Sequence, residues 1–315
     1  MRKDKINILV TGCGGDIGQS IGKILNEYNK VNTLYGCDIS EKNAAKFIYS
    51  NFIKGLPCND IDYLSFLEDI VKKKKIDLII PASEPELRFF TNKKINNITR
   101  CIIISASLRA REIGFDKLNT AQFLEKEGLP FPITFDVKDA KDAIIFPVIL
   151  KSRNGSGSQN INVIKDIMSF NYIKKMNPDF IVQEYLDGNG GEYTCGLFRS
   201  KNGVIRTIII KRKLMGGLTG YGEIIDNSEI NLLLIDIANK LNLIGSINVQ
   251  LRITSKGPIV FEINPRFSST IRFRHLLGFK DLIWCIEDQL NKSISNYYSN
   301  SVGKKIYKGY NEYIS

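Results

Sequence analysis

The first hundred residues alternate short apolar runs with amphipathic stretches. Helices are expected to begin near residues 17 and 62, and apolar runs predict strands at 6–10, 33–37, 77–80 and 101–104. Strands and helices that take turns along a chain are typical of a parallel, doubly wound sheet. We therefore predict a Rossmann-like α/β domain over residues 1–110.

A different pattern follows. The breaker cluster at 128–132 ends a helical stretch, and further helices are expected at about 166–176 and 229–242. The remaining apolar runs predict strands at 148–151, 180–185, 192–198, 204–213, 246–253 and 259–264. Strands grouped together favour an α+β domain with a largely antiparallel sheet. We place this second domain at 111–300 and a C-terminal tail at 301–315.

Composition excludes several classes of protein. The net charge of +11 comes from scattered lysines, and no basic stripe with interleaved aromatics is present, so no nucleic-acid partner is expected. No apolar run approaches the roughly 18 residues of a membrane span, and the start lacks the pattern of a signal peptide. The six cysteines form no C-x-x-C pair, which argues against a zinc site and against a secreted disulfide scaffold. We expect a cytoplasmic protein that does not bind membranes.

A glycine loop follows the first predicted strand. Gly12, Gly15 and Gly18 open a helix, and Asp38 ends the next strand, which is the setting of a dinucleotide-binding fingerprint. This spacing resembles the short-chain dehydrogenase and epimerase family. None of the thirteen tyrosines has lysine four residues later, so the Tyr-x-x-x-Lys pair of that family is absent. A tight strand-to-helix turn also explains the glycines, and an NAD(P)-dependent oxidoreductase or epimerase stays open as an alternative.

A strand near the C-terminal end carries polar side chains suited to magnesium. Glu262 and Asn264 are two residues apart and therefore project from one face of the strand. A hairpin would place Gln250, on the preceding strand, beside them. Mg²⁺ prefers such oxygen ligands together with substrate phosphates. Arg266, just beyond the strand, can reach phosphate oxygens around the same ion.

A nucleotide site can be assembled from segments upstream of this strand. Lys151 ends a strand and leads into a small-residue loop, whose backbone N–H groups can close over phosphate. The apolar strand at 181–186 stops in a polar turn and can offer backbone groups to a purine edge. Glu192 begins the next strand and can accept ribose hydroxyls.

In their order, these segments resemble the ATP-grasp superfamily, and single-copy relatives of the carbamoyl-phosphate synthase large subunit in particular. The resemblance rests on Asp116-Lys117, on Lys151 with its glycine loop, on the Glu-x-Leu hinge at 184–186, on Gln250 and on the Glu-x-Asn-Pro-Arg segment at 262–266. It covers nearly the whole chain. It implies a small lobe at about 115–183 and a large lobe at about 184–300.

The resemblance also implies roles for individual residues. Lys151 and Arg266 would be catalytic, and the metal, Mg²⁺ or Mn²⁺, would be held by Gln250, Glu262 and Asn264. ATP would be bound by Lys117, Lys151, Gly155, Ser156, Gly157, Ser158, Glu184, Tyr185, Leu186, Glu192 and Lys211. Glu84 or Glu86, after the strand at 77–80, could hold a substrate amine. Weaker candidates for binding acidic substrate groups are Lys211 and Arg212, and Arg272 and Arg274.

The implied activity is that of an ADP-forming carboxylate–amine ligase. A carboxylate would be activated by ATP as an acyl phosphate, and an amine would then displace phosphate. Both substrates are expected to be small molecules, and a homodimer is one expected assembly. Besides the oxidoreductase, a nucleotide-binding module without turnover is the remaining alternative.

Overall fold

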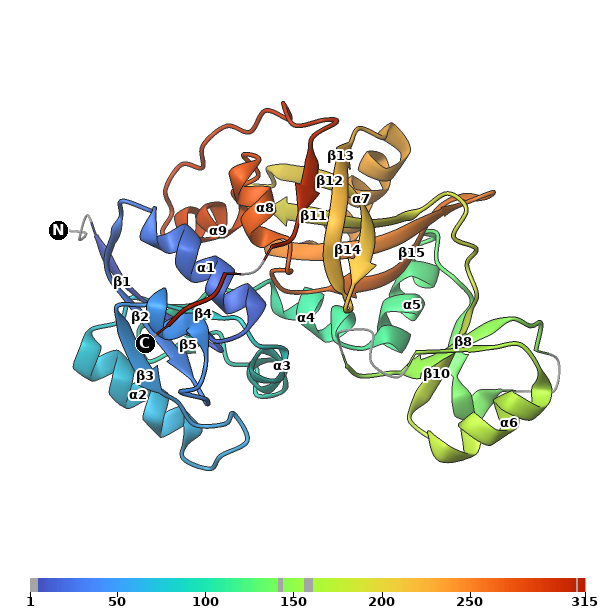
Figure 1. Ribbon diagram of the computed structural model, residues 1–315, viewed down its shortest axis with the longest axis horizontal. Coiled ribbons are helices and arrows are strands. Elements are labelled where there is room, and N and C mark those ends of the chain that lie inside the picture. The colour runs from blue at the N-terminus through green and yellow to red at the C-terminus, as the bar shows by residue number, and fades with distance from the viewer. Residues whose placement is uncertain (1–4, 141–143, 156–160, 310, 315) are drawn as a thin grey trace.

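The computed structural model describes residues 5–140, 144–155, 161–309 and 311–314, and its strands form three sheets (Figure 1). One sheet belongs to the N-terminal domain, a small one to the segment that follows, and a third to the C-terminal half. The mixed α/β and antiparallel architecture predicted from the sequence is confirmed. No helix in these described ranges has both the length and the apolar character needed to cross a bilayer.

The N-terminal sheet has the strand order β3-β2-β1-β4-β6-β5 and is parallel except for β5. Helices join successive strands because both faces of a parallel sheet must be covered. The elements are β1 (Ile6–Thr11), α1 (Asp16–Asn26), β2 (Val31–Asp38), β3 (Asn51–Lys54), α2 (Tyr63–Lys74), β4 (Leu78–Pro81), α3 (Glu84–Asn92), β5 (Asn97–Ile98) and β6 (Cys101–Ile103).

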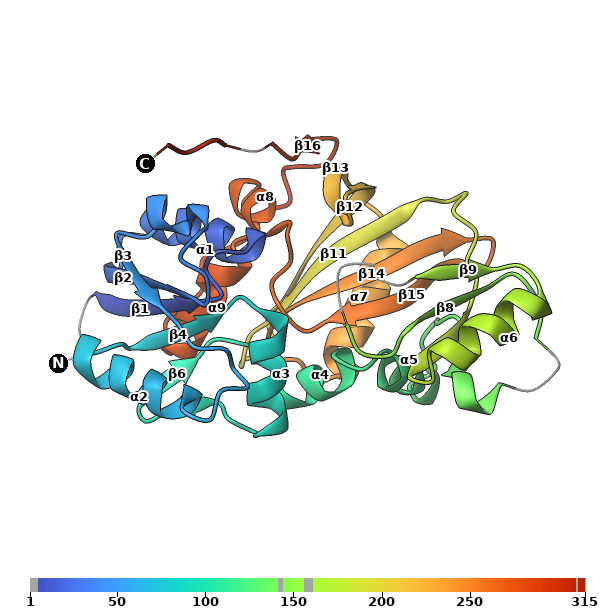
Figure 2. The ribbon, with the colours of Figure 1, turned by 60° about the horizontal axis from the view of Figure 1, so that its bottom comes forward.

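The small sheet has the antiparallel order β7-β10-β8-β9. Its apolar side chains, such as Leu150 and Val182, pack with Phe170 of the covering helix α6 in a separate core. The elements are β7 (Thr134–Asp136), β8 (Val148–Ser152), β9 (Asn162–Ile164), α6 (Ile167–Met176) and β10 (Phe180–Glu184). Figures 1 and 2 both show this lobe at the end of the molecule opposite the N-terminal domain.

The large sheet is antiparallel, with the order β15-β14-β11-β12-β13-β16. One face packs on α7 and α5, and the other packs at one end on α9 and the N-terminal domain. The elements are α4 (Leu108–Gly114), α5 (Lys117–Lys126), β11 (Glu192–Arg199), β12 (Ile205–Met215), β13 (Leu218–Ile225), α7 (Ser228–Lys240), β14 (Gly245–Thr254), β15 (Gly257–Asn264), α8 (Ile271–Leu276), α9 (Asp281–Gln289) and β16 (Lys305–Tyr307).

Two segments lie elsewhere than the sequence suggested. Residues 305–307 were expected in a tail, but they form β16 at the sheet edge, because Ile306 is apolar and buried in the core. Helix α5 was expected in the small lobe, yet Phe123 and Leu124 pack in the core of the large sheet. The small sheet is therefore a separate layer, joined to the rest through the segments before β7 and after β10.

Candidate active site

Two cavities follow the polar face of the large sheet. The first, which we call the interlobe cavity, has about 500 Å³ and lies between strands β8 and β10 of the small lobe and β14 and β15 of the large lobe. The second, the interdomain cavity, has about 840 Å³ and lies between β14 and β15 of the large lobe and the carboxyl ends of β1, β2 and β4. Arg212, Gln250 and Glu262 line both cavities, so the two spaces meet at these side chains.

The metal candidates lie together on this shared wall. In the β14–β15 hairpin Gln250 is opposite Glu262, as the sequence predicted, and Asn248 is opposite Asn264. The register shifts beside Gln250, and Phe261 therefore lines the interlobe cavity next to Glu262 instead of packing in the core.

The donor set fits a magnesium ion bound together with nucleotide phosphates. Glu262 supplies a carboxylate and Asn264 an amide oxygen at the same wall, where the amide oxygen of Gln250 already accepts a hydrogen bond from Arg212 at 2.8 Å. Among the described residues no group of three or more His, Cys, Asp or Glu side chains could hold a metal ion. Mg²⁺ commonly takes one or two protein carboxylates and completes its shell with phosphates and water. The site therefore suits a metal–nucleotide complex better than a free ion.

Two lysines face this wall from the other side of the interlobe cavity. Lys151 of β8 is 5% exposed, and its Nζ lies 5.7 Å from the centroid of the Phe261 ring. Burial lowers the pKa of Lys151 to about 8, although the charge of Glu262 acts in the opposite direction. Burial also lowers the pKa of Lys117, at the start of α5. Both ammonium groups would gain by contact with phosphate, which would replace the water they have lost.

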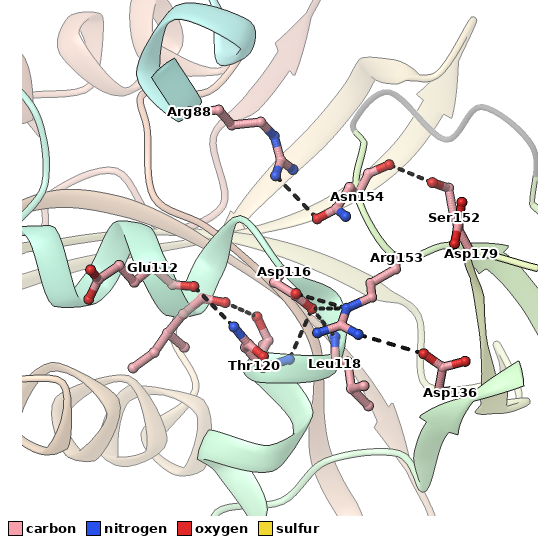
Figure 3. Close-up of polar contacts among 12 residues, drawn as sticks. Arg88, Glu112, Asp116, Leu118, Thr120, Asp136, Ser152, Arg153, Asn154 and Asp179 are labelled. Atoms are coloured by element: carbon pink, nitrogen blue, oxygen red, sulfur yellow. Dashed lines mark hydrogen bonds and ion pairs between the residues drawn. The ribbon is translucent and has the colours of Figure 1, made fainter. Parts of the chain in front are cut away.

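The loop after β8 borders the same cavity. Gly155, whose φ is +139°, lines it, and Lys117 Nζ donates to the Gly155 carbonyl at 2.6 Å. Ser156, Gly157 and Ser158 lie outside the described residues. Before the loop, Arg153 binds Asp116 at 2.8 Å and Asp136 at 3.6 Å, which ties β8 to the starts of α5 and of the small sheet (Figure 3).

The hinge that joins the lobes is partly occupied by protein contacts. The Glu184 amide donates to the Ile133 carbonyl at 2.8 Å, and the Leu186 carbonyl accepts from Arg252 at 2.8 Å. Glu184 and Leu186 line the interlobe cavity, whereas the Tyr185 side chain is 37% exposed and lies outside the lining. A purine edge would have to use the other backbone groups of this segment.

Glu192 is held by two arginines on the floor of the interlobe cavity. Arg212 donates to one carboxylate oxygen at 2.8 and 3.0 Å, and Arg252 donates to the other at 2.9 and 3.2 Å. Burial acts to raise the pKa of Glu192, but the two guanidinium groups outweigh it and lower that pKa. The carboxylate is thus ionised and firmly positioned, and a role in ribose binding stays a prediction.

Arg266 connects the end of β15 to the N-terminal domain. Its Nε lies 3.4 Å from Glu84, whose other oxygen accepts from Arg88 at 2.8 Å. Arg88 Nη1 in turn donates to Oδ1 of Asn154, in the loop of the small lobe, at 3.4 Å (Figure 3). Arg266 and Glu84 both line the interdomain cavity, so Glu84 carries a positive partner where a substrate amine was predicted.

Comparison with known protein families gives a match at this site. Residues 115–270 match the family model described as the ATP-grasp domain. The chain carries an ATP-grasp domain. The matched segment contains both lobes of the interlobe cavity, including Lys117, Lys151 and Glu262. A comparison with curated protein sequences gave no match.

Solved structures show the same fold over nearly the whole chain. An ADP complex of an N5-carboxyaminoimidazole ribonucleotide synthetase is 14% identical, with a TM-score of 0.76 over 96% of this chain and 81% of that one. The biotin carboxylase domain dimer of the Hydrogenobacter thermophilus 2-oxoglutarate carboxylase is 13% identical, with a TM-score of 0.73 over 95% and 72%. An L-amino acid ligase from Bacillus licheniformis is 14% identical, with a TM-score of 0.69 over 91% and 75%. The specific likeness to carbamoyl-phosphate synthase is a looser fit than these.

Besides Tyr185, three further predicted residues are not brought to either cavity. Lys211 is exposed, because side chains alternate along β12 and its neighbour Arg212 takes the inward position. Arg272 binds Glu27, the residue after α1, outside both cavities. Arg274 is fully buried and lies 3.1 Å from Asp281, where both groups are enclosed by the core. The structure thus offers no substrate contact for these three side chains.

The position of Arg272 gives a first testable prediction. Arg272→Gln should change the rate of ATP-dependent ADP formation less than twofold, because the side chain lies outside both cavities. Its ion pair with Glu27 is a surface contact of small energetic weight. The rate is measured by a coupled assay for ADP. A tenfold loss would mean that Arg272 does contact substrate.

The site contains two arginines that the sequence did not mark as partners of Glu192. Arg212 was, like Lys211, a weaker candidate for binding acidic substrate groups, and Arg252 was not singled out. The signal that could have found them is register: both residues are opposite Glu192 on the strands that flank it. An acidic residue on one strand that is paired with an arginine on each neighbouring strand is typical of a cross-strand ion pair.

The glycine loop borders the interdomain cavity, but acidic side chains already lie where a pyrophosphate would bind. Asp38 accepts from the Gly14 amide at 2.7 Å, and Asp16 is the first residue of α1. A pyrophosphate would have to lie at this helix N-terminus, next to both carboxylates. A Cβ on Gly18 would meet the Gly12 carbonyl at 2.5 Å, so close packing alone accounts for that glycine. The geometry therefore disfavours the oxidoreductase alternative.

Proposed function

We propose that this protein is an ATP- and magnesium-dependent, ADP-forming ligase that joins a small-molecule carboxylate to an amine. The observation that carries the proposal is the meeting of two cavities at Arg212, Gln250 and Glu262. One cavity fits a nucleotide and the other fits the substrates. The γ-phosphate would therefore lie where a substrate carboxylate can reach it.

ATP would bind in the interlobe cavity. The adenine would lie against the apolar side chains Ile149, Leu186 and Leu214, with its edge at the Glu184 carbonyl and the Leu186 amide. Lys117 and Lys151 would bind phosphate oxygens. Similar structures that contain ADP or its magnesium salt support this assignment. Glu262, Asn264 and Gln250 would hold Mg²⁺, or Mn²⁺, which when bound neutralises phosphate charge.

The chemistry proceeds in two displacements. A carboxylate oxygen attacks the γ-phosphorus, the bond to the β–γ bridging oxygen breaks, and ADP leaves. The amine nitrogen then attacks the carbonyl carbon of the acyl phosphate, loses a proton, and inorganic phosphate leaves. Arg266, at the wall of the interdomain cavity, would stabilise the charge on the transferred group. Exclusion of water from the cavities during the reaction would protect the acyl phosphate.

The amine would bind at the far end of the interdomain cavity. Asp38 and Glu86 line that end together with Asp16, which is paired with Lys308. Among the described residues, the N-terminal sheet supplies no arginine or lysine to the lining. Glu86 accepts from Thr11 at 2.6 Å and from Tyr63, and burial raises its pKa to about 7. A carboxyl group of this pKa can take a proton from an ammonium substrate near neutral pH. Of the two carboxylates expected to hold a substrate amine, Glu86 is thus preferred over Glu84.

The experiment for this proposal is a substrate screen. ADP and phosphate release is measured with Mg·ATP and a matrix of carboxylates and amines, and the product mass is recorded. Turnover that requires both a carboxylate and an amine is expected. Binding of Mg·ATP with no ADP from any pair would favour a nucleotide-binding module without turnover. Thermal stabilisation by NAD(H), without stabilisation by Mg·ADP, would favour the oxidoreductase.

The donor set predicts that magnesium and nucleotide bind together. Titration of Mg²⁺ alone into the protein should give no saturable calorimetric signal up to about 1 mM, because one carboxylate is a weak site by itself. ADP should bind at least about tenfold more tightly with Mg²⁺ than with a chelator. Saturable Mg²⁺ binding without nucleotide would contradict the assignment. A homodimer, as in the similar biotin carboxylase domain, is also proposed and is tested by light scattering.

A further inference from the structure

Arg212 lies at the junction of the two cavities, on the inward face of β12. Its side chain is 9% exposed and lines both spaces. This position follows from the alternation along the strand, because Ile208 and Ile210 on the same face are buried in the core that α9 covers. The next residue on this face of β12, toward the cavities, is Arg212.

The guanidinium is held in one orientation by its neighbours. Nε and Nη2 donate to one oxygen of Glu192 at 3.0 and 2.8 Å, and Nη2 also donates to Gln250 Oε1 at 2.8 Å. Glu192 is fixed from its other side by Arg252. The bonds that Arg212 makes with described residues thus use Nε and Nη2, and they leave the two hydrogens of Nη1 for a ligand.

The charge balance of the junction calls for such a cation. Attack of a carboxylate on a phosphate brings two anions together, and Glu262 and Glu192 add negative charge beside them. The bond from Arg212 to Gln250 Oε1 places a positive group between the metal candidates and the floor of the cavity. A planar, always charged guanidinium can contact phosphate and carboxylate oxygens at once.

We infer that Arg212 is a catalytic residue that binds the γ-phosphoryl group during its transfer to the substrate carboxylate. This assignment rests on the proposed function. Glu192 and Arg252 are then positioning residues, because Glu192 orients the guanidinium and Arg252 holds Glu192. Lys151 and Lys117, which lie on the opposite wall of the interlobe cavity and do not line the interdomain cavity, would act on the nucleotide alone.

The test compares nucleotides that differ in the γ-phosphate. Calorimetry gives the affinities of Mg·ADP and of the magnesium complex of AMPPNP, a non-hydrolysable ATP analogue, for wild type and Arg212→Met. We expect the variant to bind Mg·ADP within threefold of wild type and Mg·AMPPNP at least tenfold more weakly. With any carboxylate and amine pair that supports turnover, kcat should fall at least tenfold.

Lys211→Met is the matched control, since Lys211 is the adjacent residue of β12, equally cationic, and faces away from both cavities. It should leave both affinities within twofold. Circular dichroism and a melting curve establish that each variant is folded, and Arg212→Gln, which can still donate to Glu192, replaces the Met variant if that one does not fold.

The assignment would be overturned if the Arg212 substitution weakened the binding of Mg·ADP and Mg·AMPPNP equally, or weakened neither. If wild type forms no ADP with any substrate pair, the ligase proposal fails. The comparison of AMPPNP with ADP still decides whether Arg212 contacts the γ-phosphate, so the two failures are distinguishable.

Discussion

Glu262→Gln is expected to lower ATP-dependent ADP formation at least about 10²-fold. Glu262 is the carboxylate at the wall shared by the two cavities, opposite Gln250 in the β14–β15 hairpin. A neutral amide of the same shape removes the charge that would hold Mg²⁺ near the transferred phosphoryl group. Loss of several kcal/mol of charge stabilisation in the transition state corresponds to a rate loss of this size.

The matched control is Glu223→Gln on β13 of the same sheet. Glu223 is also a carboxylate in a strand, but it lies outside both cavities. Its substitution should leave the rate of ADP formation within twofold of wild type. Equal turnover by Glu262→Gln and wild type would remove the proposed metal site. Equal losses in the two variants would point to a general effect on the sheet.

The affinity for Mg·ADP is expected to weaken above pH 8, approaching tenfold for each further pH unit. Phosphate binds the protonated form of Lys151, and burial lowers the pKa of this group to about 8 in the free protein. Below pH 8 the ammonium is already present. Above that pH, binding must take up a proton, so the observed dissociation constant rises until the pKa of the bound state is reached.

Calorimetry between pH 6.5 and 9.5 measures this dependence. In Lys151→Met the profile should be flat, and the affinity at pH 7 should be about 10²-fold weaker than that of wild type, since a buried charge–phosphate contact is lost. Lys165→Met, at an exposed position between β9 and α6, is the control and should follow the wild-type profile. An unchanged pH profile in Lys151→Met would show that another group titrates.

The parts of the site that were predictable from sequence depend on short-range geometry. The face shared by Glu262 and Asn264 follows from the two-residue period of a strand. The position of Gln250 opposite Glu262 follows from a hairpin with a short turn, and the register confirms it. The alternation in the first hundred residues predicted the parallel sheet, because helices are needed on both of its faces.

The parts that failed depend on long-range register and packing. The bulge at Phe261 moves an apolar side chain from the core to the nucleotide cavity, and nothing in the local pattern marks it. On β12 the side chain of Arg212 points toward the cavities and that of Lys211 does not. Only the pairing of β12 with β11 decides which of the two points inward. Strand β13 was missed because its glycines and the Gly216–Gly217 turn before it are typical of a loop.

Arg274 shows a further limit of sequence reasoning. A run of arginines near a predicted phosphate site suggests substrate contact, but Arg274 is fully buried and its charge is compensated by Asp281, seven residues along the chain. Burial lowers the pKa of Arg274 and raises that of Asp281. A buried pair of this kind is fixed by the packing of α8 and α9, which local sequence patterns do not specify.

Transfer of oxygen from the substrate carboxylate to phosphate tests the central claim most directly. The protein is incubated with Mg·ATP, an amine and a carboxylate labelled with ¹⁸O in both oxygens, using a pair that supports ADP release. Formation and displacement of an acyl phosphate moves one carboxylate oxygen to the released phosphate. We predict one ¹⁸O atom in each inorganic phosphate, detected by mass spectrometry. Phosphate without ¹⁸O, formed together with ADP, would contradict activation of the carboxylate by this protein.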